Sequence, residues 1–164
     1  MATRIEHRAT FAHDTADVYA AQTDEQALRA RLERLGGKHA ELREHVVTES
    51  GVRYTLSQGI AADKLPSLVR SLHSGDLIVR REHVWTDLGD RYTGTIAVAV
   101  SDVPGRITAD VELAPSADGC TQLTRGEVAV RIPLVGGKIE SFVVDQVTRL
   151  LETETDFTKQ WLAR

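Results

Sequence analysis

The sequence lacks the features that mark several common classes of protein. It has one cysteine, Cys120, in 164 residues, so an internal disulfide framework is excluded and a reducing, cytoplasmic location is expected. No stretch approaches the roughly 18 consecutive apolar residues of a membrane-spanning helix. The first residues lack the apolar core of a signal peptide. We therefore expect no integral membrane association.

An excess of positive charge is also missing. The chain has 20 Lys and Arg against 24 Asp and Glu, a net charge of -4. Since phosphate contacts need clustered basic residues, no nucleic-acid partner is expected. The hydrophobic content of 41% and charged content of 27% are typical of a folded globular protein. The length favours one domain over residues 1–164.

The motifs of common metal and nucleophile sites are absent as well. The sequence has no cysteine pair and no His-Glu-x-x-His motif, and it has no Gly-x-Ser-x-Gly turn. We therefore expect no metal and no cofactor. Gly136-Gly137-Lys138 lacks the spacing of a phosphate loop. It favours a structural hinge, although its amides could also face an anion at a helix start.

The main positive feature is a long one-sided helix at the carboxyl end. Between about residues 138 and 162, apolar residues recur every three or four positions. At 1.5 Å per residue this helix is about 37 Å long, so it needs an equally long apolar surface to pack against. The apolar positions are Ile139, Phe142, Val143, Val147, Leu150, Leu151, Phe157 and Trp161.

The rest of the chain predicts a sheet with two short helices after its first strand. Residues 2–11 alternate as a half-buried strand. Asp14 can cap a first helix, and Thr23 with Gln26 has capping-box spacing for a second. A change of phase around Gly126 predicts a bulge in the last strand. Short links favour an antiparallel meander and an α+β fold. The six further strands are predicted at 38–49, 52–60, 76–87, 91–101, 105–114 and 120–132.

One connection, over residues 61–75, is longer. Pro66 fits a first helical turn and Gly75 a stop, so a short amphipathic helix is predicted. It could be a mobile lid over a pocket mouth, a permanent cover of the sheet edge, or a docking surface for another protein. Its apolar positions are Leu65, Leu68, Val69 and Leu72.

This order of elements resembles the helix-grip architecture of the START and birch-allergen-like (SRPBCC) superfamily, over essentially the whole chain. The segments Arg4-Ile5-Glu6-His7 with Phe11, and 132–140, are similar to a bacterial family known as a domain of unknown function. The resemblance implies a cavity between a curved sheet of about seven strands and the long helix. It also implies an apolar ligand such as a lipid, sterol or polyketide. Some relatives are cyclases or hydrolases, and fold alone does not choose among these functions.

Glu154 and Trp85 are the least expected residues of the predicted cavity. Glu154 lies within the helix stripe and could orient a ligand's hydroxyl or ammonium group, or serve in acid–base chemistry. The commoner case is a glutamate paired with an arginine or hydrated. Trp85 shares a strand face with Arg81 and His83, which points outward or lines a partly polar cavity. The predicted lining set is Tyr54, Leu56, Trp85, Phe142, Leu150, Glu154 and Phe157.

Three functions are compatible with these patterns. The favoured one is binding or carrying a small hydrophobic molecule, driven by transfer of apolar surface out of water. The second is a cyclase- or aromatase-like enzyme that uses Glu154 or a strand histidine. The third is a protein-binding module that docks through the segment around Leu68. The expected partner is a small hydrophobic molecule, and the expected state is a monomer or homodimer.

Overall fold

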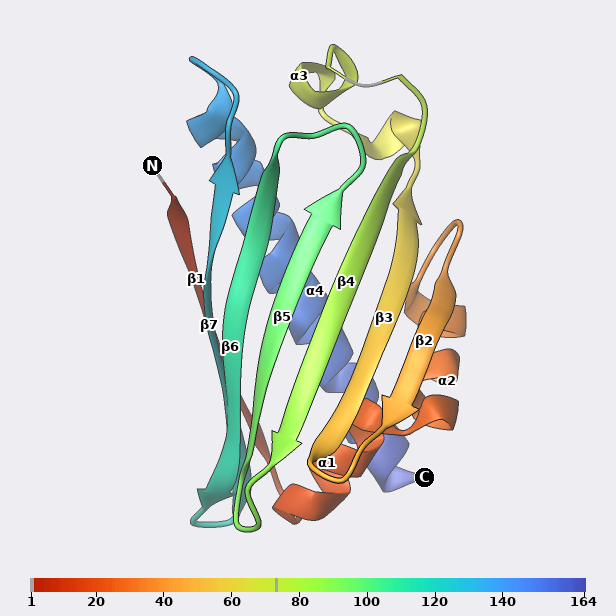
Figure 1. Cartoon of the computed structure of the whole chain (residues 1–164), viewed down its shortest axis with the longest axis vertical. Coiled ribbons are helices and arrows are strands. Elements are labelled where there is room, and N and C mark those ends of the chain that lie inside the picture. Colours follow the sequence, from red (N-terminus) through yellow and green to blue (C-terminus); the bar gives the residue numbers. More distant parts are fainter. Residues whose placement is uncertain (1, 73) are drawn as a thin grey trace.

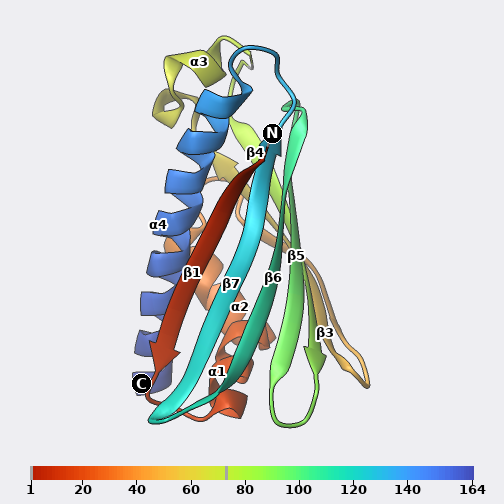
Figure 2. The same cartoon turned by 90° about the vertical axis from the view of Figure 1, so that its left-hand side faces the viewer.

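The computed structural model describes residues 2–72 and 74–164 and shows a seven-stranded antiparallel sheet with a long helix across one face (Figure 1). Helix α4 (Gly136–Ala163) crosses behind the sheet and runs beside its β1 edge (Figure 2). The predicted α+β helix-grip fold is confirmed. The strands lie in the order β1 (Thr3–Phe11), β7 (Gly119–Val130), β6 (Gly105–Ser116), β5 (Tyr92–Val100), β4 (Leu77–Asp87), β3 (Gly51–Ile60) and β2 (Glu41–Val47).

The two short helices are α1 (Thr15–Thr23) and α2 (Glu25–Leu35), at the lower end of the sheet in Figure 1. The predicted cap of the second helix is wrong by one residue. The Asp24 carboxylate accepts a hydrogen bond from the Ala27 amide at 3.3 Å. Thr23 still belongs to α1, and its hydroxyl donates to the Tyr19 carbonyl at 2.8 Å. Thr23 therefore has helical backbone and cannot act as an N-cap.

The irregularity in strand pairing lies in β2, not in β7 as predicted. Register shifts between Leu42 and Glu44 where β2 pairs with β3. Strand β7 pairs continuously with β1 and β6. Gly126 lies directly opposite Ala109, and a Cβ added there would collide with the Thr108 carbonyl. The alternation breaks because close strand approach requires a glycine, not because an extra residue is inserted.

Most buried apolar side chains of the described residues belong to one of two clusters. The larger, which we call the lower core, joins the sheet to α1 and α2 and includes Val18, Leu28, Leu56, Leu113 and Cys120. The smaller lies at the opposite end and contains Leu65, Val69 and Leu77, with Val100 and Val103 packed against it.

The small cluster is built by the long connection, which is less helical than predicted. It holds η1 (Ala62–Lys64) and the single turn α3 (Ser67–Arg70). Pro66 precedes α3 with extended backbone and does not lie in the first turn. The residue before a proline is biased away from helix, so η1 and α3 are separate turns.

Candidate ligand-binding site

Helix α4 is buried at both ends and half-exposed between them. Ile139 and Glu140 are buried near its start, and Glu154, Phe157 and Thr158 near its end. All residues from 141 to 153 are described, and none of them is buried. That stretch nevertheless carries the middle of the apolar stripe: Phe142, Val143, Val147, Leu150 and Leu151 are only partly covered.

The sheet shows the same change along its inner face. Low on the sheet the inward-facing side chains of β4, β6 and β7 are buried, as at Trp85, Leu113 and Cys120. Higher up, Val128, Ile5 and Leu77 are also buried, but several inward-facing apolar residues between them are only half-buried. They are Val79, Ile96, Val98, Ile107, Ala109 and Val130. We call these residues, together with Phe142, Val143, Val147, Leu150 and Leu151 of α4, the apolar strip.

Small side chains and backbone separation account for this exposure. Register places Ile96, Ala109 and Gly126 side by side across β5, β6 and β7, so two of the smallest residues adjoin on the inner face. The backbone of α4 approaches β1, β7, α1 and α2 most closely rather than the central strands. The apolar strip therefore keeps apolar surface in contact with water.

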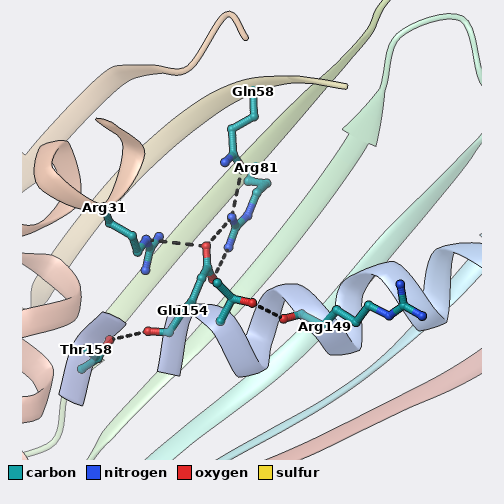
Figure 3. Close-up of polar contacts among 7 residues, drawn as sticks. Arg31, Gln58, Arg81, Arg149, Glu154 and Thr158 are labelled. Atoms are coloured by element: carbon teal, nitrogen blue, oxygen red, sulfur yellow. Dashed lines mark hydrogen bonds and ion pairs between the residues drawn. The ribbon is translucent and has the colours of Figure 1, made fainter. Parts of the chain in front are cut away.

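Below the apolar strip, four polar side chains from four elements meet (Figure 3). The Arg81 guanidinium of β4 donates to both Glu154 carboxylate oxygens of α4, at 2.9 and 3.1 Å. It also donates to the Gln58 side chain of β3 at 3.1 Å. The Arg31 Nε of α2 lies 3.5 Å from Glu154 Oε2. Arg31, Arg81 and Glu154 are 6%, 5% and 9% exposed, and we call them the arginine–glutamate cluster.

Arginine pairing fixes the charge of Glu154. Burial by itself raises the pKa of a carboxyl group, but the Arg31 and Arg81 charges and the Arg81 hydrogen bonds outweigh burial and lower the pKa of Glu154 to about 2. Both oxygens of an ionised carboxylate are thus held by arginines near neutral pH. This confirms the arginine-paired alternative for Glu154 and disfavours its use as a general acid or base.

His83 lies beside the cluster as a neutral side chain. Its ring stacks on Tyr54 with centroids 4.6 Å apart. Burial, reinforced by the Arg81 and Arg31 charges, lowers the pKa of His83 well below its usual value. Its Nε2 atom is buried and has no hydrogen-bond partner among the described residues, and the same holds for Arg31 Nη2 and the Tyr19 hydroxyl. Buried polar atoms without partners are uncommon in folded proteins.

The structure divides the predicted lining residues between packed and half-exposed regions. Tyr54, Leu56, Trp85 and Phe157 are buried, the first three within the lower core. Phe142 and Leu150 belong to the apolar strip, and Glu154 lies at the boundary. The strand face shared by Arg81, His83 and Trp85 points inward. The sequence-based alternative in which this face points outward is therefore wrong.

Sequence reasoning missed the role of Arg31. The signal was present, because Arg31 lies three residues after Leu28 and four before Leu35 on the apolar stripe of α2. A cation at such a position predicts a buried counter-ion. Its partner, 123 residues later in sequence, could not be identified from spacing.

Two hollows lie on the outer face of the sheet. They have volumes of about 850 and 550 Å³ and are lined mainly by outward-facing threonines and charged residues such as Glu82, Thr95, Asp110 and Arg125. Across residues 2–72 and 74–164, no helix is long and apolar enough to cross a membrane. Within the same ranges, no three His, Cys, Asp or Glu side chains gather closely enough to hold a metal ion.

A long helix packed across a seven-stranded antiparallel sheet gives this chain a helix-grip fold. Norcoclaurine synthase from Thalictrum flavum has a similar fold, with a TM-score of 0.66, 13% identity and coverage of 100% of this chain and 88% of that one. Ara h 8.0201 matches with a TM-score of 0.61 and 10% identity, over 99% of both chains. Identities this low show the fold alone.

The chain belongs to the family described as "Protein of unknown function (DUF2505)", which it matches over residues 6–162. One protein with a similar sequence is "Uncharacterized protein Rv0481c" of Mycobacterium tuberculosis. It is 30% identical over 159 residues, which cover 95% of this chain and 87% of the relative.

Proposed function

We propose that this protein binds and carries one small apolar molecule, lipid-like or polyketide-like, between the middle of α4 and the inner face of β4–β7. The observation that carries the proposal is the apolar strip, in which two facing layers leave apolar side chains half-covered. Covering such surface contributes about 25 cal/mol per Å² before the costs of ordering the ligand. An apolar molecule is therefore the natural occupant.

Packed apolar clusters lie at both ends of the proposed site. The lower core, with Tyr54, Leu56 and Trp85, packs below it, and Phe157 packs near the end of α4. The small cluster around Leu77 and Val100 covers the inner face at the opposite end. The ligand in this proposal lies against Phe142 and Leu150, with Glu154 at the floor.

The segment 61–72 is the proposed entry. Leu65 and Val69 anchor it in the small cluster, while Leu68 is half-buried and Leu72 is 45% exposed. One helical turn held by few apolar contacts opens at low free-energy cost. Its outward movement would uncover the upper end of the apolar strip.

A similarity in fold adds support of a general kind. Norcoclaurine synthase of Thalictrum flavum has been crystallised in complex with dopamine and hydroxybenzaldehyde. Small organic molecules thus bind to at least one protein of this fold. An acid–base reaction at Glu154 is not favoured here, because its carboxylate is ionised and held by two arginines.

The test is a titration with N-phenyl-1-naphthylamine, a neutral apolar dye whose fluorescence rises on leaving water. We expect saturable binding to the full chain. Val147→Asp, which puts a charge in the apolar strip, should weaken it at least tenfold. The neighbouring control Gln146→Asp is exposed and should bind as the unaltered chain does. No saturable binding to the unaltered chain would overturn the proposal.

A further inference from the structure

The arginine–glutamate cluster contains more positive than negative charge. Two buried guanidinium groups share one carboxylate. His83 is neutral, so it does not change this sum. Among the described residues, the charged or titratable groups that interact with Glu154 are Arg31, Arg81, His83 and Tyr54, and burial raises the pKa of Tyr54, which keeps its hydroxyl neutral. Within residues 2–72 and 74–164, Glu154 is the ion-pair partner of both arginines, so the cluster has a net charge of +1.

Buried hydrogen-bond donors in and beside the cluster are unpaired among the described residues. Arg31 Nη2 is a buried N–H group with no acceptor in the part of the chain that the structure describes, and an arginine never gives up its charge in a protein. His83 Nε2 is equally unpaired and can carry a proton in one tautomer. An unpaired buried donor is costly, and an unpaired buried charge more so. A carboxylate is the group that would satisfy both.

The arginine–glutamate cluster adjoins the apolar strip both on the sheet and on helix α4. Arg81 is registered directly beside Val98 of β5, and Val79 is the next inward-facing residue along β4. Glu154 lies one helical turn after Leu150. From Glu154 to Phe142 the helix extends about 18 Å at 1.5 Å per residue. An extended twelve-carbon chain fits within that length.

We propose that the ligand is an amphipathic carboxylate, whose anionic head binds Arg31 beside His83 and whose apolar tail lies along the apolar strip. This inference rests on the proposed function and specifies its ligand class. The charge proposed for the ligand's head group is opposite to the one that the sequence suggested. A lone glutamate among apolar residues favoured a hydroxyl or ammonium group. Charge-assisted hydrogen bonds in a site shielded from water are strong, so the head group dominates selectivity.

The experiment compares three ligands that share one tail: dodecanoate, dodecanol and dodecyltrimethylammonium. Each displaces N-phenyl-1-naphthylamine from the full chain, below its micelle concentration. We expect dodecanoate to bind at least tenfold more tightly than dodecanol, and the cation to bind weakest. Arg31→Gln should reduce dodecanoate affinity to that of dodecanol and leave dodecanol unchanged. Arg29→Gln, an exposed arginine of the same helix paired with Glu25, should change neither.

A second measurement needs no variant. Carbon-13 NMR of carboxyl-labelled dodecanoate bound to the unaltered chain should show a carboxylate that stays ionised at lower pH than the free acid does. Equal or tighter binding of dodecanol or the cation, or an unshifted titration of bound dodecanoate, would overturn this inference and leave the proposed function standing. If neither the dye nor any of the three ligands binds, both fall.

Discussion

The two halves of the layer between sheet and helix are made from the same sequence pattern but have different environments. In the lower core, side chains such as Leu56 and Leu113 are fully buried. In the apolar strip, residues such as Val98 and Val147 remain partly covered. Both halves have regular spacing on α4 and on the strands. Periodicity thus identifies the inward face of an element, whereas the separation of layers decides whether that face is filled.

The boundary between the halves is the arginine–glutamate cluster, and its loss should have the largest effect on stability. Glu154→Gln leaves two buried guanidinium groups without a carboxylate. Breaking a buried ion pair from one side costs about 3–5 kcal/mol, to be measured by urea unfolding. Glu152→Gln, an exposed neighbour on α4, should stay within about 0.5 kcal/mol of the unaltered chain. A loss below about 1 kcal/mol for Glu154→Gln would show that the pairing contributes little to stability.

The next largest effect on stability should come from truncating a side chain in the lower core, and the same truncation in the apolar strip should cost less. Leu56→Ala removes a fully buried side chain from the lower core and should cost about 2–5 kcal/mol. Val147→Ala, in the apolar strip, should cost about 1 kcal/mol or less, since its side chain is already partly hydrated. Chemical denaturation of both variants provides the comparison. Similar losses at the two positions would contradict the distinction.

The pH dependence of stability should report on the neutral histidine at the boundary. Folding lowers the pKa of His83 well below its usual 6.5, so below pH 6.5 the unfolded chain binds a proton that the folded chain does not. Stability should therefore fall as pH drops through 6.5, with a slope of up to about 1.4 kcal/mol per pH unit. His83→Phe should remove this slope, whereas His13→Asn should retain it. An unchanged slope in His83→Phe would show that folding does not lower the pKa of His83.

Glu154 adds a second, more acidic transition. Its folded pKa of about 2 lies below the ordinary 4.5, so its stabilisation is complete above pH 4.5 and is lost as pH falls towards 2. In the unaltered chain, unfolding measured between pH 5 and 2 should show this decline. Glu154→Gln should lack it, and a decline of equal size in that variant would assign it to other carboxyl groups.

The fold was predictable because its signals are local. The spacing of Ile139 to Trp161 and the alternation in the strands follow from one element at a time, as does the order of elements. The errors were local as well. Thr23 has the spacing of a cap for the second helix, but α1 does not end before Thr23. At Gly126 the alternation is interrupted by close strand contact, which looks the same in sequence as an inserted residue.

The site was less predictable because it depends on distances between elements. The sequence identifies Glu154 as an unusual residue of the helix stripe, but its partners Arg31 and Arg81 come from α2 and β4. Only the assembled fold shows that two cations meet one anion. Equally, Trp85 and Phe142 both have inward spacing, yet one is packed and the other half-exposed. Sequence alone assigns them the same role.

The most direct test of the account is to fill the space beneath α4 with a side chain. Ala109→Phe places a ring on the inner face beside Gly126, while Thr108→Phe places the same ring on the outer face of β6 as a control. If the apolar strip borders open space, Ala109→Phe should unfold within about 1 kcal/mol of the unaltered chain and lose N-phenyl-1-naphthylamine binding. The control should keep both properties. A cost above about 2 kcal/mol, the range for overpacking a filled core, or undiminished dye binding would contradict the account.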